Sequence, residues 1–404
     1  MERIFRRAFC FSVLTIFCVS LTSCETKCAA PKTVSGATPI EWSERLANSE
    51  MPRLTNALKW DYTMGLFTLS LLKLNEQVPD ARFVKFSEDK IGGLISPDGN
   101  ITGYKPQEYQ LDAINPGKTA LALWQITGND KYKKAAEILR RQLDTQPRTF
   151  DGGFWHKERY TNQMWLDGIY MAEPFYAEYG KLFGEPKDFD DGAKQIRLMG
   201  EHTYDSKTGL YFHGWDAVKV QSWANPQTGC SSNFWGRAVG WYAMAMVDTL
   251  DFFPTNHPAR KEILSRFQDL CASVVKFQDK KTGLWWQVLD EVGRDGNYQE
   301  ATASAMFTYA IAKGVNKNYL PENYARFARK GFDGIVNKLI VKDGGDSWSL
   351  TQCCSVAGLG FTNSKGHPRD GSFAYYVSEP ITKDDLKGVG SFILAGIEVQ
   401  YLPK

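Results

Sequence analysis

Two aspartates could do acid–base chemistry, because each lies near the start of a segment that is otherwise apolar. Asp167 lies in Gln163-Met-Trp-Leu-Asp-Gly168, and Asp112 has the matching place in the preceding apolar segment. Apolar neighbours on both sides predict partial desolvation, which favours a protonated carboxyl group, whereas a helix N-terminus favours the anion. A second carboxylate nearby would tip the balance toward the acid, so the pair predicts general acid–base catalysis. For either aspartate alone, a helix cap or a buried ion pair explains the residue equally well.

A cation and a histidine accompany these carboxylates. Arg237 lies among aromatic residues in Phe234-Trp-Gly-Arg-Ala-Val-Gly-Trp241, where a charge needs a partner. That partner is Asp112, Asp167 or an anionic group on a substrate, unless the arginine forms a core salt bridge. His213 and Trp215 lie in the connecting stretch Tyr211–Asp216, and His213 is either a structural hydrogen-bonding group or a site residue. Polar or aromatic side chains near the starts of the apolar segments complete the set: Trp60, Asp61, Tyr62, Asn115, Asn162, Trp165, Asn233, Trp235, Trp241 and Glu300.

Alternating helical segments must position these side chains. Six segments are apolar nearly all round, as in helices that are buried on every side: 56–76, 110–127, 161–184, 231–252, 298–315 and 386–402. Six others carry one apolar and one charged face and belong outside: 41–51, 80–92, 130–147, 187–204, 258–278 and 321–339. The alternation predicts an all-α fold, a closed (α/α) barrel of six helical hairpins. The alternative is an open helical solenoid, whose inner helices would be less uniformly apolar.

The connections between segments repeat one design. Asp151-Gly-Gly-Phe-Trp-His156, Thr208-Gly-Leu-Tyr-Phe-His213 and Thr282-Gly-Leu-Trp-Trp-Gln287 each combine a glycine turn, paired aromatics and a hydrogen-bonding side chain. Such repeats indicate an array of one supersecondary unit. In a closed array, one end of every inner helix faces a common funnel, so the polar residues near these ends should converge. Residues 340–385 interrupt the pattern with a long irregular loop region, and loops of this length are usually functional.

The composition narrows the function class. The chain has 404 residues, is 43% hydrophobic and 23% charged, and carries a formal net charge of +2. No strong field therefore favours nucleic acid or an anionic membrane. The 12 Trp, 18 Tyr and 24 Phe include many that lie beside polar residues, where aromatic faces suit sugar rings. We find no phosphate-binding glycine loop, nucleophile elbow, zinc-helix motif or metal cluster in the sequence.

The N-terminus has the pattern of a targeting segment. A positive stretch with Arg3, Arg6 and Arg7 precedes an apolar run too short to span a bilayer. The run ends in Leu21-Thr22-Ser23-Cys24, which resembles a bacterial lipobox, although a cleavable signal with a chance cysteine is the alternative. We therefore expect a lipoprotein signal peptide over 1–23, lipidation of Cys24, a tether over 24–40 and one catalytic domain over 41–404. The five cysteines beyond this segment are interpreted as structural thiols: Cys28, Cys230, Cys271, Cys353 and Cys354.

Four motifs, taken in order, resemble glycoside hydrolase family 105, the unsaturated rhamnogalacturonyl hydrolases, which are related to the unsaturated glucuronyl hydrolases of family 88. They are Gln163–Gly168, Tyr211–Asp216, Trp235–Trp241 and Arg369–Phe373. The similarity runs over about residues 52–402, and several motifs in order make it specific. It implies the same six-hairpin barrel, no cofactor, and action on Δ4,5-unsaturated uronosyl ends of oligosaccharides. The resemblance places the catalytic acid on Asp167, the second carboxylate on Asp112, and substrate contacts on Tyr62, His213, Trp235, Arg237 and Trp241. It also places Arg369 and Asp370 beside the pocket without a role.

The implied partner is an acidic, unsaturated oligosaccharide, with membrane contact only through the lipid. The implied location is the periplasm or outer membrane of a Gram-negative bacterium. Two other functions stay open from the sequence. One is an inverting hydrolase of intact glycans, with carboxylates about 6.5–9.5 Å apart. The other is a non-catalytic, glycan-binding lipoprotein. The sequence does not distinguish galacturonyl from glucuronyl substrates.

Overall fold

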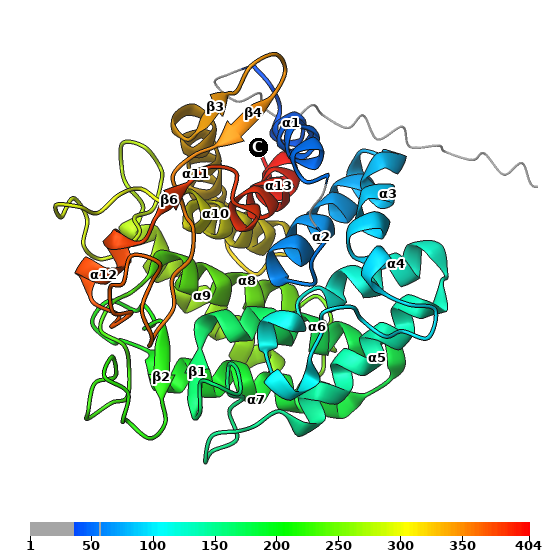
Figure 1. The fold of residues 1–404 in the computed structure, drawn as a ribbon. Helices are drawn as coiled ribbons and strands as arrows, with labels where there is room; N and C mark the ends of the chain where they lie inside the picture. The colour runs from blue at the N-terminus through cyan, green and yellow to red at the C-terminus, as the bar shows by residue number, and fades with distance from the viewer. Residues whose placement is uncertain (1–35, 56–57) are drawn as a thin grey trace, which may run out of the picture. The chain divides into compact units, whose positions relative to one another are not determined.

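Six buried helices form the inner ring of the protein (Figure 1), whose computed structural model describes residues 36–55 and 58–404. They are α2 (Tyr62–Gln77), α4 (Gly117–Thr127), α6 (Leu166–Phe183), α8 (Gly236–Thr249), α10 (Ala301–Asn316) and α13 (Leu386–Gln400). Each packs against the next in chain order, and α13 packs against α2. The ring is therefore closed, which confirms the predicted barrel and shows that the open solenoid is wrong.

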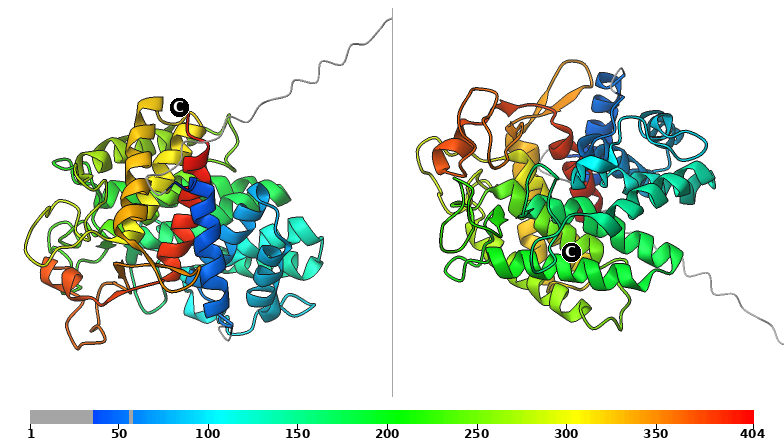
Figure 2. Two further views of the ribbon diagram at one scale, coloured as in Figure 1. Left: turned by 90° about the horizontal axis from the view of Figure 1, so that it is seen from above. Right: turned by 60° about the horizontal axis from the view of Figure 1, so that its bottom comes forward.

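Six outer helices cover this ring. They are α1 (Pro39–Arg53), α3 (Ala81–Lys90), α5 (Asp130–Thr145), α7 (Pro186–Thr203), α9 (Arg260–Val274) and α11 (Ala325–Lys338). From α3 onward each packs on the inner helix that precedes it, whereas α1 packs on α13, seen as blue and red helices side by side in Figure 2. In α5 the buried side chains of Tyr132, Leu139 and Leu143 share one face, and Lys134 and Arg141 are exposed. The charged face predicted for the outer helices is thus the solvent face.

The inner helices pack closely because small residues lie between them. Every residue of α8 is buried. At Gly240 a side chain would clash, since a Cβ there would lie 2.9 Å from the Cβ of Met306 on α10. Glycine at this position lets the two helices approach, and dense packing of this kind makes the ring a rigid frame for the residues at its rim.

Most of the inner helices begin several residues later than predicted. For example, α6 begins at Leu166 rather than 161, and α8 at Gly236 rather than 231. The residues before them are extended instead: β1 (Gln163–Trp165) pairs antiparallel with β2 (Gly214–Asp216), and Trp235 forms a bridge with Val288. These two connections therefore each pair with the next one around the rim, a long-range contact that helical periodicity does not reveal.

The interrupting region contains regular structure that was not predicted. β3 (Ile340–Lys342) and β4 (Trp348–Leu350) form a hairpin, and β5 (Cys353–Cys354) pairs with β6 (Ile381–Thr382) around α12 (Phe373–Ser378). Irregular backbone remains over residues 355–372, apart from a bridge between Thr362 and Pro368. The cysteines of the described part are buried free thiols: Cys230, Cys271, Cys353 and Cys354.

The expectations for the N-terminus lie mostly outside the described residues. These are the signal peptide over 1–23, the lipidation of Cys24, Cys28, and most of the tether over 24–40. α1 begins at Pro39, two residues before the predicted helix, and Thr38 caps it with Glu41 in a capping box. Within residues 36–55 and 58–404, no helix is both long and apolar enough to cross a bilayer.

Candidate active site

A repeated backbone hydrogen bond gives the predicted site residues equivalent positions at one end of the barrel. At the start of four successive inner segments, a backbone N–H donates to a carbonyl of the following connection, at 2.8 to 3.1 Å. The donors are Leu111, Leu166, Gly236 and Ala301, and their acceptors are His156, His213, Gln287 and Gln352. The next residues along the chain, Asp112, Asp167 and Arg237, therefore occupy equivalent positions around the rim. The barrel brings the three predicted charged groups to one end, as the sequence indicated.

Asp112 is held as an anion by cationic and polar neighbours. It is buried in the 3-10 turn Leu111–Ala113, with its Oδ2 2.6 Å from Lys157 Nζ and its Oδ1 3.4 Å from His156 Nε2. Burial acts to raise the pKa of Asp112, but Lys157 and His156 outweigh it, so the pKa falls below its ordinary value. Burial lowers the pKa of His156 to about 4, against the opposing charge of Asp112. Asp112 is thus ionised at neutral pH, and Lys157 carries the compensating charge.

Asp167 has a different environment in the first turn of α6. Its side chain is 14% exposed, and its Oδ2 lies 3.1 Å from His213 Nε2. The two atoms are not aligned for a hydrogen bond, and within the described part of the chain Oδ2 has no other polar partner. Asp167 is therefore largely buried, as predicted, and its Oδ2 is a buried acceptor without a hydrogen-bond partner among the described residues.

A tyrosine orients the imidazole beside Asp167. His213 is fully buried, and its Nδ1 lies 2.9 Å from the Tyr376 hydroxyl of α12. Burial raises the pKa of Tyr376 well above its ordinary value, so the phenol stays protonated and can donate to Nδ1. The contact fixes the ring orientation, which leaves Nε2 3.1 Å from Asp167 Oδ2.

Arg237 is a buried cation that packs against the ring of Trp235. Its guanidinium carbon is 4.6 Å from the centre of the Trp235 ring, and the group donates to the Cys354 carbonyl. Arg237 is only 1% exposed, and Nε has no partner among the described residues. Burial acts to lower its pKa, but Cys354 and Glu300 outweigh this and raise it, so the group stays charged. Of the partners that the sequence left open, neither Asp112 nor Asp167 pairs with Arg237, because the guanidinium turns toward β5.

Tyr62 and Trp241 close another side of the site. Tyr62 begins α2, its ring centre is 6.4 Å from that of Trp241, and Trp241 stacks on Tyr170 at 4.7 Å. Burial raises the pKa of Tyr62 well above its ordinary value, the negative charge of Asp112 raises it further, and Arg237 opposes the shift. The Tyr62 phenol therefore lies within electrostatic reach of both charges.

Some predicted residues lie elsewhere. Trp215 stacks on His202 of α7 at 3.5 Å, in the outer layer, whereas His213 of the same connecting stretch lies beside Asp167. The Asn115 amide contacts Met171 in the core, whereas that of Asn233 donates to the Gly371 carbonyl. Arg369 pairs with buried Glu379 at 3.4 Å, which gives it a structural part in the 355–379 region.

Sequence reasoning missed three supporting residues: His156, Lys157 and Tyr376. The repeated connections carried a signal for the first, because His156, His213 and Gln287 end the three matching motifs. His156 contacts Asp112 and His213 contacts Asp167. In the third connection the Gln287 amide accepts from Trp235 Nε1 at 3.1 Å. The last residue of each connection thus supports the preceding rim residues. Nothing local in the sequence indicates Tyr376, which comes from the interrupting region.

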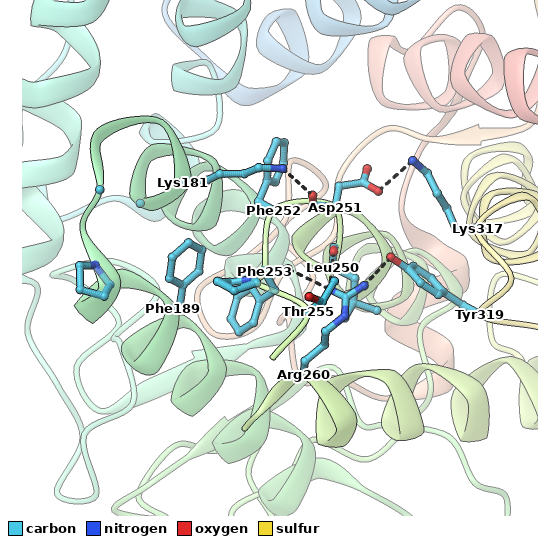
Figure 3. A pocket seen from close by; sticks show the side chains of 14 residues that line it. Lys181, Phe189, Leu250, Asp251, Phe252, Phe253, Thr255, Arg260, Lys317 and Tyr319 are labelled. Carbon is cyan, nitrogen blue, oxygen red and sulfur yellow. Dashed lines mark hydrogen bonds and ion pairs between the residues drawn. The ribbon is translucent and has the colours of Figure 1, made fainter. Parts of the chain in front are cut away.

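The opposite end of the barrel has a large groove without such chemistry. The cavity has a volume of about 700 Å³ and lies where α6, α8 and α10 end. Figure 3 shows the side chains that line it. Lys181 donates to the Asp251 carbonyl, the Asp251 carboxylate pairs with Lys317 at 3.4 Å, and Arg260 donates to Tyr319. These charged groups bond to one another, and none of the predicted site residues lines the groove. The rim of helix N-termini is therefore the candidate active site.

Comparison with known proteins decides the family. The family model of Glycosyl Hydrolase Family 88 matches residues 39–402. The chain belongs to this family. A solved family 105 glycoside hydrolase from C. acetobutylicum is 41% identical, with a TM-score of 0.85 over 89% of this chain and 99% of that one. The resemblance stated from the motifs is thus confirmed, and the chain is a glycoside hydrolase rather than a binding protein.

Two further relatives extend the comparison. A protein of Agrobacterium fabrum is 39% identical over 232 residues, which cover 56% of this chain and 97% of that protein. An unsaturated rhamnogalacturonyl hydrolase of Bacillus subtilis is 28% identical over 284 residues, which cover 69% of this chain and 76% of that enzyme. Both matches, like the solved structure, align with a large share of the barrel.

Proposed function

We propose that this glycoside hydrolase removes a Δ4,5-unsaturated uronic acid from the non-reducing end of short oligosaccharides. One observation carries the proposal: a mostly buried carboxylate, Asp167, keeps an oxygen without a hydrogen-bond partner among the described residues. Its neighbour at the equivalent rim position, Asp112, is fixed as an anion by Lys157. The name of the Bacillus subtilis relative supports the same substrate class.

The substrate is an enol ether, so Asp167 must first protonate a carbon atom of the double bond. Asp167 delivers its proton to C4 of the double bond, and positive charge develops at C5 and the ring oxygen. The carboxylate, now ionised, accepts a proton from the water that adds to C5. The resulting hemiketal collapses and releases the aglycone. One group acts first as acid and then as base, and His213 Nε2 lies 3.1 Å from it.

The remaining rim residues bind and orient the sugar. Lys157 and Arg237 supply positive charge for the uronate carboxylate, and Asp112 accepts hydrogen bonds from sugar hydroxyls. Tyr62 offers aromatic surface to the ring, and Trp235 and Trp241, each 1% exposed, pack behind the residues that meet the sugar. In this arrangement binding and proton transfer use different residues, so substitutions can separate KM from kcat.

The ultraviolet absorbance of the conjugated double bond tests the reaction. We expect the purified protein to abolish this absorbance on lyase-generated unsaturated disaccharides and to leave the saturated counterparts intact. A panel with galacturonyl and glucuronyl ends identifies the sugar. Hydrolysis of the saturated disaccharides with the absorbance unchanged would contradict the proposal and favour an inverting hydrolase of intact glycans.

We also propose that the enzyme is exported and anchored by a lipid on Cys24, in the periplasm or outer membrane of a Gram-negative bacterium. The positive stretch, short apolar run and Leu21-Thr22-Ser23-Cys24 support this proposal. Cys24→Ser should leave the protein unprocessed or soluble in cell fractionation, whereas Cys28→Ser should not. Unchanged membrane association of Cys24→Ser would refute lipid anchoring.

A further inference from the structure

An exposed aromatic side chain lies in the irregular region over residues 355–372. Phe361 is 65% exposed and has a φ of +58°, a left-handed conformation that bulky side chains rarely adopt. Two backbone bonds hold it there: Gly360 N–H donates to the Arg369 carbonyl at 2.8 Å, and Arg369 N–H donates to the Phe361 carbonyl at 2.9 Å. Arg369 is in turn paired with buried Glu379. A fixed backbone therefore presents an apolar ring to solvent.

A continuous ladder of rings joins Phe361 to the catalytic rim. The Phe361 ring centre is 5.8 Å from that of Tyr160, which lies 4.4 Å from Trp165. Trp165 stacks on His156 at 4.7 Å and meets His213 edge-on at 5.4 Å. The inner end of the ladder thus touches the imidazoles that contact Asp112 and Asp167, and its outer end is the exposed Phe361.

A guanidinium lies over the outer end of this ladder. Arg159 Cζ is 4.9 Å from the Tyr160 ring centre and 5.3 Å from that of Phe361, and Arg159 donates to the Tyr160 hydroxyl at 3.0 Å. Arg159 is exposed and pairs with no carboxylate of the described residues, and its charge helps to lower the pKa of Asp112. Stacking leaves the donors at the edge of the guanidinium free for a planar anion.

We propose that Phe361, Tyr160 and Arg159 form the subsite for the leaving-group side of the substrate. Phe361 stacks on the sugar next to the unsaturated residue, and Arg159 binds an anionic group on this part of the substrate, either a carboxylate or a sulfate. The inference rests on the proposed function and adds its substrate class: oligosaccharides whose aglycone is itself acidic. An exposed ring and a cation without a carboxylate partner among the described residues suit a chain that continues toward solvent.

Kinetics on unsaturated uronosides with different aglycones test this subsite. The series comprises a methyl aglycone, a neutral sugar, a sulfated sugar, and a neutral sugar that carries a second uronate. Arg159→Gln should lose about tenfold in kcat/KM on at least one of the two anionic aglycones, the value of one charge-assisted bond, and little on the other substrates. The anionic aglycone that is affected identifies the group bound. Arg159→Lys should recover part of the loss.

Phe361→Ala should raise KM for every sugar aglycone several-fold and leave the methyl substrate unchanged, and Phe361→Trp should restore the wild-type KM. Phe150→Ala is the matched control, because Phe150 is 79% exposed and lies beside Trp215 in the outer layer. Equal kinetics of wild type, Arg159→Gln and Phe361→Ala across the series would overturn the subsite. If wild type instead fails on the methyl substrate and on all the others, the proposed function itself fails.

Discussion

Asp112 and Asp167 hold equivalent positions on neighbouring inner segments, yet their surroundings differ. Asp112 has an ammonium 2.6 Å from one oxygen and an imidazole 3.4 Å from the other. Asp167 faces a single imidazole, and its Oδ2 makes no hydrogen bond within the described part of the chain. A carboxylate beside a lysine stays ionised, whereas a largely buried one with no lysine or arginine of the described residues at contact distance can carry a proton to a substrate. The repeat thus supplies two similar positions, and their neighbours assign them different roles.

This contrast predicts the largest effect at Asp167. Asp167→Asn should retain the fold and substrate binding but lose about 10²–10⁴-fold in kcat, because the amide cannot donate a proton to carbon. Steady-state assays on an unsaturated disaccharide, with binding measured by calorimetry on the same preparation, give both values. Turnover within a few-fold of wild type would show that the proton comes from another group.

The stability that buried His156 contributes beside Asp112 should depend on pH. Buried His156 has a pKa of about 4, below the ordinary histidine value of 6.5, so the unfolded chain takes up the proton first as pH falls. Its contribution to stability is fully present above about pH 6.5 and is lost between pH 6.5 and 4, by up to about 3 kcal/mol. Urea unfolding at pH 7 and 4.5 should show a smaller decline for His156→Gln than for wild type. An equal decline in both proteins would place the acid-sensitive group elsewhere.

Asp112→Asn should have a smaller effect than Asp167→Asn. The change leaves Lys157 without its anion and weakens binding of the sugar. We therefore expect roughly a tenfold loss in kcat/KM, mostly through KM. The pH–rate profile should also move, because a fixed negative charge near the acid is gone. A loss as large as that of Asp167→Asn, with KM unchanged, would make the two carboxylates equal partners in the chemistry.

The smallest change is expected at Tyr376. Tyr376→Phe removes the hydroxyl that lies 2.9 Å from His213 Nδ1 but keeps the ring that stacks near Trp235. We expect a few-fold decrease in kcat, the value of one hydrogen bond that orients the imidazole, with KM nearly constant. Gln142→Ala is a control for loss of a remote hydrogen bond. Identical kcat for Tyr376→Phe and wild type would show that His213 needs no orientation from α12.

Sequence patterns sufficed for the ring and for the residues that the repeat places at its rim. Apolar periodicity identified inner and outer helices, because burial on all sides leaves a direct trace in composition. Asp112 and Asp167 followed from their matching places in the chain. The late starts of α6 and α8 did not, since they arise from pairing between connections that are far apart along the chain. Nor could Tyr376 or the direction of Arg237 be predicted, because both depend on how residues 340–385 fold over the rim.

The fate of C4 tests most directly whether the reaction begins with proton transfer to carbon. The reaction is run in D₂O on an unsaturated disaccharide, and early product is examined by NMR beside isolated product kept in the same solvent to measure later exchange. We predict that wild-type enzyme places one deuterium on C4 as the double bond disappears, and that Asp167→Asn forms this product at a rate lower by about 10²–10⁴-fold. Release of the aglycone with the double bond intact and no deuterium on C4 would contradict the account.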